Sequence, residues 1–358
     1  MTGMGTTGAT TPRHRLYLPY TVGLDSPITY LFERIAPHFD AETFEATVFS
    51  ADRSRVIDAD HVREVYAPSG LRRRLALLAT SLRSHDLLHT GGLGHYRISQ
   101  LAHLRNPGLR HVHTFRVDVN SSTFPTERKR ELLELVDAVT AVSEHTAATV
   151  EAEYGVSPTV IYNGVDTELF RPDHDRPQLL AAHGAEEPVF VFVGNFVDRK
   201  RPADVLEVAR RIEDATFLFF GDGPLFDELR PAADALGNVR FLGRVPKSTL
   251  PAVYANARGL VFPSIREGCP NVVLEAMASG TPVVGYDATS MPELVTTGRT
   301  GFLAEPGDVA GLVEGVRSLL DPERAADLGR AARDYAESNH RFDQRASAYE
   351  AVYQTVLE

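Results

Sequence analysis

Residues 266–284 read REGCPNVVLEAMASGTPVV, and this stretch decides the fold. It follows the apolar run GLVF at residues 259–262, which is typical of a buried parallel strand. A glycine and a proline then interrupt regular structure, Asn271 is a favoured helix N-cap, and the next residues predict a short helix that ends at Gly280. A second apolar strand begins at Pro282. In such a unit the helix N-terminus lies at the carboxyl edge of a parallel sheet, and its free N–H groups favour an anion such as phosphate.

Two carboxylates flank this predicted anion site. Glu267 lies in the loop and Glu275 lies in the helix, with seven residues between them. Because like charges repel, a carboxylate beside a phosphate site suits the neutral hydroxyl groups of a sugar or a ribose. The alternative is that both glutamates only complement the positive end of the helix dipole.

The stretch resembles the signature of the family 4 retaining glycosyltransferases, which have the GT-B fold. Their pattern is E-G-x-P-x-x-x-x-E-A-M-A-x-G-x-P-V-V, and the chain matches it at Glu267, Gly268, Pro270, Glu275, Ala276, Met277, Ala278, Gly280, Pro282, Val283 and Val284. The resemblance implies that Glu267 contacts the hydroxyl groups of the donor sugar and that Glu275 holds the ribose of the nucleotide. It also implies that the donor diphosphate lies beside the loop and the first helical turn, at Gly268, Cys269, Pro270, Asn271, Val272 and Val273.

Length and composition predict two globular domains. The chain has 358 residues, 43% of them hydrophobic and 24% charged, and its net charge of −11 argues against nonspecific nucleic-acid binding. Its one cysteine, Cys269, excludes an internal disulfide and a multi-cysteine zinc site. Residues 1–12 predict a disordered tail rather than a signal peptide, and no apolar run is long enough to span a membrane, so we expect a cytoplasmic protein, at most at the inner face of the membrane.

The first half alternates short apolar runs with amphipathic stretches, which predicts an open parallel sheet with helices on both faces. The predicted strands are residues 14–18, 46–49, 62–66, 86–89, 112–115, 138–142 and 160–162. The clearest predicted helices are residues 27–36 and 143–154, the second with Ser143 as a helix cap that relatives direct towards their cleft.

Three positions of the first half match the family's site more loosely. The loop after the first strand is glycine-rich in relatives, and here Gly23 is its single glycine. Relatives often carry Thr-x-His at the end of a later strand, and that histidine reaches the donor sugar. Thr114-Phe115-Arg116 puts Arg116 in the histidine position, whereas a shifted register makes His113 the equivalent, and both assignments stay open.

Residues 70–84 predict a basic amphipathic helix. The leucines fall on one helical face and the arginines flank it: Leu71, Leu75, Leu78 and Leu82, with Arg72, Arg73, Arg74 and Arg83. Such a helix suits the surface of an anionic membrane, where several relatives glycosylate lipid-linked acceptors. The alternative is a surface helix that packs its leucines on the core of the domain.

Residues 160–172 give the second close match to the family. Relatives share the Asn-Gly-Val-Asp…Phe-x-Pro pattern, here starting at Asn163, at the passage between the two domains. Asn163-Gly164 predicts a turn that leaves the sheet, and the polar residues up to Glu187 predict a linker.

The second half opens with an apolar strand that ends at Gly194. Relatives then place an arginine and, five residues later, a lysine, and both cations neutralise the departing diphosphate. Lys200 matches the lysine, but Asn195 stands where the arginine is expected, so Arg199 or Arg201 is a candidate to compensate. Further on, Gly221 and Gly223 predict close backbone approach to the nucleotide or a neighbouring loop. In relatives the end of the next strand borders the base pocket, so the resemblance implies that Val245 contacts the base. All three are candidate donor-binding residues.

The predicted architecture is the GT-B fold: two Rossmann-like parallel-sheet domains that face each other across a cleft. The predicted parts are a tail at 1–12, an acceptor domain at 13–165, a linker at 166–187, a donor domain at 188–340 and a helix at 341–358 that returns to the first domain. The predicted function is retaining transfer of a hexose-type sugar from a nucleotide-diphosphate donor, with UDP favoured over GDP, to a glycan, lipid-linked or small-molecule acceptor.

The predicted chemistry needs no cofactor and no metal. Charge stabilisation on the leaving diphosphate, from N–H groups and Lys200, is its main requirement. The Asp-x-Asp patterns at residues 58–60 and 173–175 are short enough to arise by chance. The alternatives are a nucleotide-sugar-binding subunit without activity, which the changes at Asn195 and Arg116 favour, and a hydrolase or epimerase on the same fold. A dinucleotide-dependent enzyme is disfavoured because no Gly-x-Gly-x-x-Gly follows the first strand.

Overall fold

The computed structural model describes residues 13–22, 27–50, 57–67, 71–91, 96–116, 126–174 and 177–358. They form two compact units. The first unit contains the chain up to Thr114, residues 123–140 and residues 346–358, and the second contains residues 115–122 and 141–345. Gly23 lies outside the described residues.

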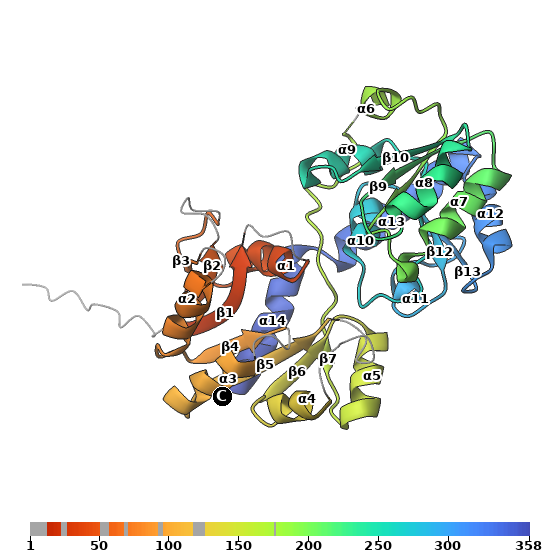
Figure 1. The fold of residues 1–358 in the computed structure, drawn as a ribbon. Coiled ribbons are helices and arrows are strands. Elements are labelled where there is room, and N and C mark those ends of the chain that lie inside the picture. Colours follow the sequence, from red (N-terminus) through yellow and green to blue (C-terminus); the bar gives the residue numbers. More distant parts are fainter. Residues whose placement is uncertain are drawn as a thin grey trace, which may run out of the picture. The chain divides into compact units, whose positions relative to one another are not determined.

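Strands and helices alternate along both halves of the chain (Figure 1). The first half contains β1 (His14–Val22), α1 (Pro27–Ile35), η1 (Ala36–His38), β2 (Phe44–Ser50), β3 (Val62–Tyr66), α2 (Leu71–Ser81), β4 (Leu87–Thr90), α3 (Tyr96–Arg105), β5 (Arg110–Phe115), α4 (Thr126–Leu133), β6 (Ala138–Ala141), α5 (Glu144–Tyr154) and β7 (Thr159–Val160). The second half contains α6 (Pro177–Ala181), β8 (Val189–Val193), η4 (Asp198–Lys200), α7 (Pro202–Arg211), β9 (Thr216–Phe220), α8 (Phe226–Asp234), β10 (Val239–Gly243), η5 (Lys247–Thr249), α9 (Leu250–Ala255), β11 (Gly259–Phe262), α10 (Asn271–Ala278), β12 (Val283–Tyr286), α11 (Met291–Leu294), β13 (Gly301–Ala304), α12 (Val309–Ser318), α13 (Pro322–Asn339) and α14 (Phe342–Leu357).

The first sheet has the order β3-β2-β1-β4-β5-β6-β7, and each pairing described between β3 and β5 is parallel. One face packs against α2 and α3 through a cluster that includes Tyr17, Phe49, Leu77, Leu88, Ala102 and Leu109. On the other face, rings of α1 and α14 surround His89. The predicted strands and the open parallel sheet are therefore confirmed, with strand ends shifted by a few residues.

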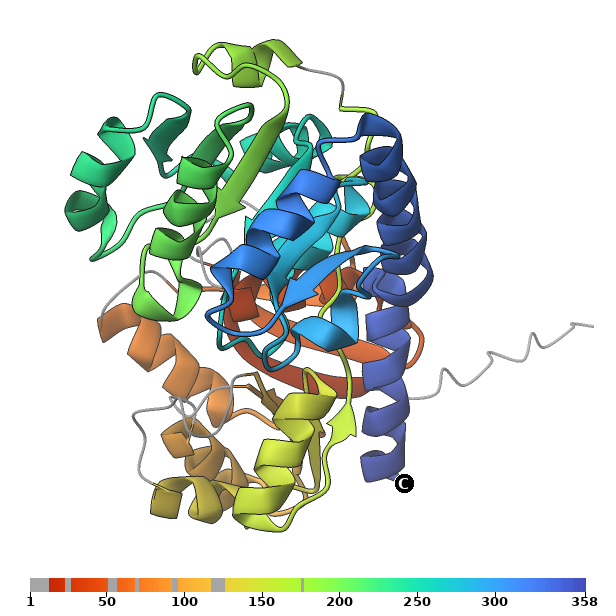
Figure 2. The same cartoon turned by 90° about the vertical axis from the view of Figure 1, so that its right-hand side faces the viewer.

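The second sheet has the order β10-β9-β8-β11-β12-β13, and its described pairings are parallel. Its central strands are apolar on both sides, as β8 shows: Val189, Val191 and Val193 join one buried cluster, and Phe190 and Phe192 join another. Helices α9, α10 and α13 contribute to the first cluster, and α7 and α12 contribute to the second. Figure 2 shows α7 in green and α12 in blue side by side over the second face.

Helix α14 carries the chain back to the first unit, as predicted. From Ala346 onward its residues belong to that unit. The Tyr353 hydroxyl lies 2.6 Å from Nδ1 of His89 in β4, and its ring packs against Phe39 and Phe44.

Helix α2 departs from one of the two interpretations of its sequence. Three of its predicted face residues are exposed to solvent, Leu75 by 54%, Leu78 by 43% and Leu82 by 44%. The alternative that these leucines pack on the domain core is therefore wrong for all three. No described helix has the length and apolar character needed to cross a membrane.

Candidate functional site

The candidate site lies where the strand order of the second sheet reverses. From β8 the chain proceeds outward through β9 and β10, and it then returns to β11 on the other side of β8. Ligands of open parallel sheets bind at the carboxyl ends of the strands beside such a reversal. The segments that follow β8 and β11 are residues 194–200 and 263–270. They contain eight of the predicted site residues: Gly194, Asn195, Arg199, Lys200, Glu267, Gly268, Cys269 and Pro270.

One carboxylate oxygen gathers three donors at this edge. Glu267 Oε1 lies 2.5 Å from Lys200 Nζ, 2.8 Å from Arg199 Nη1 and 2.5 Å from Ser264 Oγ. Lys200 is buried and its Nζ lies 4.3 Å from the centre of the Phe262 ring. Burial lowers the pKa of Lys200, and the adjacent Glu267 carboxylate opposes that shift. Among the described residues none donates to Glu267 Oε2, so this oxygen is available to accept from a substrate hydroxyl.

The structure separates the two arginines that were candidates to replace the family's arginine. Arg199 points to the cluster, where Nη1 also donates to the Arg266 carbonyl at 3.1 Å. Arg201 instead donates from Nε to Asp204 Oδ2 at 3.0 Å. Its backbone is left-handed, with φ of 52°. Asn195, in the expected arginine position, is exposed. Arg199, and not Arg201, is therefore the arginine that shares the Glu267 carboxylate with Lys200.

Helix α10 presents its N-terminus next to this cluster. Pro270 precedes the helix without a side-chain cap, so the prediction that Asn271 caps it is wrong: Asn271 is the first helical residue. The N–H groups of Asn271 and Val272 have no backbone acceptor among the described residues, whereas that of Val273 donates to the Pro270 carbonyl at 3.1 Å. Two amide donors and the positive end of the helix dipole are thus available to an anion.

Asn163 holds the loop that leads into α10. Its Nδ2 donates to the Cys269 carbonyl at 2.7 Å and to Asn271 Oδ1 at 2.9 Å. Its Oδ1 accepts from Arg116 Nη2 at 3.0 Å. The side chain is buried, so each of these bonds is sheltered from water. The sequence predicts Asn163 in a turn at the passage between the two domains, and the structure adds a contact to the loop of residues 263–270 before α10, the signature loop.

Two further features fix this loop. A Cβ on Gly268 would lie 2.1 Å from the Arg116 carbonyl oxygen, so only glycine fits. The Glu267 N–H donates to Thr289 Oγ1 at 3.0 Å. Thr289 has a left-handed backbone, with φ of 50°, which is strained for a β-branched residue and typical of functional sites. Nothing in the sequence distinguishes Thr289 or Ser264, because short polar residues are common in loops.

Glu275 and Cys269 are buried, and burial affects both groups. Burial raises the pKa of Glu275 to about 7, opposed by Lys247 and by the Tyr254 hydroxyl, which donates to Oε2 at 3.3 Å. Burial also raises the pKa of the Cys269 thiol to about 12, so it is neutral and a poor nucleophile near pH 7. Within the ranges that the structure describes, no group of three or more His, Cys, Asp or Glu residues is placed to hold a metal ion.

The glycines after β9 allow their loop to pack closely against the loop after β8. A Cβ on Gly221 would lie 1.9 Å from the Gly194 carbonyl oxygen, and one on Gly223 would lie 2.6 Å from the Phe196 carbonyl oxygen. Their role in the structure is close contact between neighbouring loops, one of the two alternatives that the sequence left open. Val245 is partly buried and packs against the core of the second unit.

His113 and Arg116 lie in different surroundings. His113 is buried in the first unit, where Nδ1 lies 2.7 Å from Thr90 Oγ1, which also lies 2.8 Å from His111 Nε2. Arg116 belongs to the second unit and contacts Asn163. The structure therefore brings Arg116, but not His113, to the signature loop within one unit.

Two family models match the two halves of the chain. Residues 30–169 match the model "Glycosyltransferase Family 4", and residues 175–335 match "Glycosyl transferases group 1". Together these matches cover most of the chain.

Curated relatives match with about one third identity. A GDP-mannose-dependent alpha-(1-6)-phosphatidylinositol monomannoside mannosyltransferase of Mycolicibacterium smegmatis is 33% identical over 251 residues, which cover 64% of this chain and 66% of the relative. An N-acetyl-alpha-D-glucosaminyl L-malate synthase of Bacillus anthracis is 31% identical over 238 residues, which cover 63% of this chain and 61% of the relative. The match thus spans just under two thirds of the length of these relatives.

Solved structures share the fold at lower identity. Sucrose-phosphate synthase of Thermosynechococcus elongatus superimposes with a TM-score of 0.79 at 20% identity, over 96% of this chain and 99% of that one. HepE of Anabaena in complex with UDP gives a TM-score of 0.77 at 20% identity, over 96% of this chain and 100% of that one. Both likenesses support the GT-B fold.

Proposed function

We propose that this chain, which belongs to the family 4 glycosyltransferases, transfers a sugar from a nucleoside diphosphate sugar to a hydroxyl group of an acceptor, with retention of configuration. The observation that carries the proposal is the cluster of Lys200, Arg199 and Glu267 beside the open N-terminus of α10. It combines cations and amide donors for a diphosphate with a carboxylate for sugar hydroxyls.

In the proposed complex the diphosphate lies at the N-terminus of α10. The N–H groups of Asn271 and Val272 and the side chains of Lys200 and Arg199 bind its oxygens, and Glu267 Oε2 accepts a hydrogen bond from a hydroxyl of the sugar. Both cations now pair with Glu267, so a bound phosphate would share cations that are already in place. Glu275 accepts hydrogen bonds from the ribose.

The proposed reaction breaks the bond between the anomeric carbon and the phosphate oxygen. The acceptor oxygen forms its bond on the same face, and its proton passes to the departing phosphate. The negative charge that develops on the diphosphate is the largest electrostatic change, and preorganised donors stabilise it without reorganisation. Lys200 is suited to this role because its ammonium group is buried and its position is fixed by Glu267 and the Phe262 ring. We propose that these groups act without a metal ion.

We propose a hexose donor with uridine or guanosine as its base. The M. smegmatis relative is named as GDP-mannose-dependent, and the HepE structure contains UDP, which supports either base. The acceptor is proposed only as a hydroxyl compound, of glycan, lipid-linked or small-molecule type.

A thermal-shift screen of the purified protein against UDP, GDP, ADP and their sugar conjugates tests the donor site. A nucleotide at ~100 times its dissociation constant should add about 2.7 kcal/mol to the free energy of unfolding. We expect one nucleotide class to stabilise the wild type and to lose this effect in Glu275→Gln. If no nucleotide raises the melting temperature, the donor site as described here is wrong. Stabilisation without donor turnover across an acceptor library would favour a binding subunit, and turnover without an acceptor would favour a hydrolase.

A further inference from the structure

Helix α2 turns its hydrophobic side to solvent. The leucine row consists of Leu75 and Leu78 on the exposed face of α2 and of Leu82, which directly follows the helix; each is between 43% and 54% exposed. The opposite face buries Leu77 together with the polar residues Thr80 and Ser81. A helix that packs only on its own domain does the reverse, because burying leucine rather than threonine or serine lowers the free energy.

The orientation of α2 is fixed by contacts on its buried side. Tyr17 OH of β1 donates to the Leu77 carbonyl at 3.1 Å, and Leu77 packs in the cluster under the first sheet. Ser81 Oγ donates to the Leu78 carbonyl at 2.7 Å, so this buried hydroxyl is satisfied. Rolling the helix to bury the leucine row would break the Tyr17 hydrogen bond and remove Leu77 from this cluster. The row is thus held outward, where a second surface can cover it.

A basic hollow lies at the C-terminal end of the leucine row. Its volume is about 340 Å³, and three exposed arginines from separate elements line it, Arg15 of β1, Arg63 of β3 and Arg83 after α2. Leu82 lines the same hollow, which joins the row to the arginines.

The other charged groups of the hollow leave it positive. Glu45 is the one acidic residue among the described residues that line it. Asp86 lies nearby and pairs with Arg15 at 3.4 Å. His85 also lines the hollow, and burial lowers its pKa, so it adds no charge near pH 7. This excess of positive charge occurs in a chain whose net charge is −11.

The surrounding sequence has the same bias. Residues 68–116 contain eight arginines and no lysine, against one acidic residue, Asp86. Helix α2 itself contains three arginines and no acidic residue. The leucine row therefore lies in the most basic part of an acidic protein.

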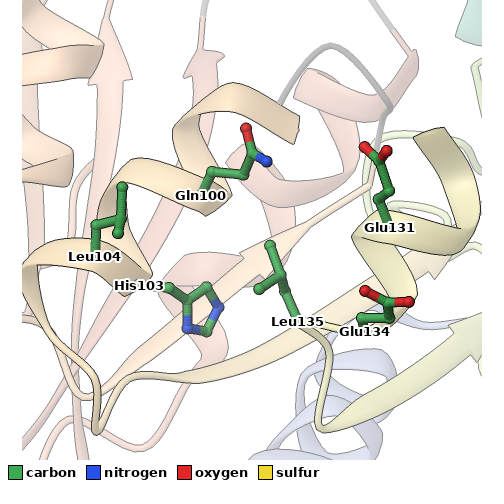
Figure 3. A pocket seen from close by; sticks show the side chains of 6 residues that line it. All are labelled: Gln100, His103, Leu104, Glu131, Glu134 and Leu135. Atoms are coloured by element: carbon green, nitrogen blue, oxygen red, sulfur yellow. The ribbon is translucent and has the colours of Figure 1, made fainter.

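A second hollow of the first unit does not share these properties. Between α3 and α4 a pocket is lined by Gln100, His103, Leu104, Glu131, Glu134 and Leu135 (Figure 3). Two glutamates face it, so it would repel an anion. Leu104, which is 81% exposed, lines this pocket and supplies a control for the effect of an exposed leucine.

We propose that the leucine row and the hollow of Arg15, Arg63 and Arg83 form a docking surface for an anionic phospholipid bilayer. The leucines enter the boundary between head groups and acyl chains, and the guanidinium groups bind lipid phosphates in their fork geometry. Apolar side chains beside a cluster of arginines match a bilayer surface, whereas binding to the backbone of a nucleic acid would leave the leucines exposed. This inference is independent of the proposed donor site, since the hollow lies at the amino ends of β1 and β3 in the first unit.

The test is sedimentation of the full chain with vesicles of phosphatidylcholine alone or with 30% phosphatidylglycerol. We expect binding to the anionic vesicles only. The triple variant Leu75→Gln/Leu78→Gln/Leu82→Gln should lower the partition coefficient more than about tenfold, and Leu104→Gln should leave it unchanged. The double variant Arg63→Gln/Arg83→Gln should lower the partition coefficient by about fivefold per arginine, and this effect should be weaker at high salt. The control is Arg317→Gln, which changes an exposed arginine of α12 and should leave the partition coefficient unchanged.

Failure of this proposal is distinguishable from failure of the proposed function. If the wild type does not sediment with anionic vesicles, or if the triple variant sediments as well as the wild type, the surface does not dock on membranes. If the triple variant instead converts a dimer to a monomer in sedimentation velocity without vesicle binding, a second copy covers the row and the proposal is wrong. Nucleotide-induced thermal stabilisation, measured on each variant, should be unchanged and reports on the donor site separately.

Discussion

The two sheets share one topology but place their polar groups differently. The interior of the second sheet is apolar, with phenylalanine rings of β8 packed against those of β9. The candidate site lies in loops at its carboxyl edge. The first sheet buries three histidines within its strands, His89, His111 and His113. In the second unit, therefore, the polar candidate site lies in loops outside an apolar sheet. In the first unit, polar side chains are part of the buried sheet itself.

The buried histidines of the first sheet are joined by hydroxyl groups. Thr90 Oγ1 lies within 2.8 Å of nitrogens of both His111 and His113. His89 Nε2 lies 2.7 Å from Thr114 Oγ1. Burial, with the neighbouring histidines, lowers the pKa of His111 well below its usual range. The folded protein therefore favours the neutral form of His111.

The largest effect is expected when the buried cation of the candidate site, Lys200, is removed. Lys200→Met should lower kcat/KM for sugar transfer by roughly 10²- to 10³-fold, because it deletes a preorganised donor to the leaving diphosphate. Steady-state kinetics with the donor found in the thermal-shift screen measures it. A loss below tenfold would mean that the cluster at Glu267 is not where charge develops.

The second effect is the pH-dependent loss of folding stability caused by the buried Glu275. The pKa of Glu275 is about 7 in the folded protein, above its ordinary value of 4.5. Between these pH values the folded protein holds a proton that the unfolded chain releases, so the free energy of unfolding falls by up to about 3 kcal/mol as pH rises from 4.5 to 7. Glu275→Gln should remove this slope and be more stable than the wild type at pH 8, yet bind nucleotide more weakly. Urea unfolding at pH 5 and pH 8 checks this, and equal pH slopes in both proteins would argue against it.

A smaller effect is expected at the residue that holds the signature loop. Asn163→Ala should destabilise the protein by about 2 kcal/mol, because it removes the hydrogen bonds of the Asn163 side chain to Arg116 Nη2 and to the Cys269 carbonyl. If Asn163 also positions the loop, nucleotide affinity falls as well. Asn256→Ala is the matched control, since Asn256 Nδ2 donates to the carbonyls of His174 and Ala252. It should lower stability but retain nucleotide affinity, and the same affinity in both variants would reduce Asn163 to a structural role.

Arg199 and Arg201 offer a comparison within one turn of chain. Arg199→Ala should lower kcat/KM about tenfold, as for loss of one charged hydrogen bond. Arg201→Gly should have little effect, because glycine accepts the left-handed backbone and the side chain points to Asp204. The reverse ranking of the two variants would assign the phosphate to Arg201.

The smallest effect tests the first sheet. Thr90→Val keeps the shape of the side chain but removes the hydroxyl between His111 and His113, so we expect a loss of about 1–2 kcal/mol. Hydrogen exchange should increase in β4 and β5 and remain unchanged in β8 to β13. An equal increase in both sheets would show that the units unfold together.

Sequence reasoning predicted most of the fold because the alternation of apolar runs and amphipathic stretches is strong in both halves. It placed β3 at residues 62–66, as observed, and identified the return of the C-terminal helix. In the site, Glu267 and Glu275 could be identified because they lie in one continuous motif. Lys200 could be identified because it lies at a fixed distance after the first strand of the second half. The roles of Thr289 and Asn163 were not visible, since each acts through a contact with a loop more than 20 residues away. Nor could spacing choose between Arg199 and Arg201, whose directions depend on a left-handed residue.

Helix α2 shows the limit of periodicity. The pattern of leucines predicted an apolar face correctly, but it could not say what that face contacts. Leu77, Thr80 and Ser81 occupy the buried side instead, where the Tyr17 hydroxyl donates to the Leu77 carbonyl. Such a choice depends on residues distant in sequence.

Hydrogen exchange with and without the nucleoside diphosphate that stabilises the protein most tests the central claim directly. The claim is that the donor diphosphate binds at the carboxyl edge of the second sheet. We expect protection in residues 194–200 and 264–275, lost in Lys200→Met, with no protection in the strand interiors of the first sheet. Protection confined to β1–β5, or none at residues 264–275, would contradict the assignment of the donor site.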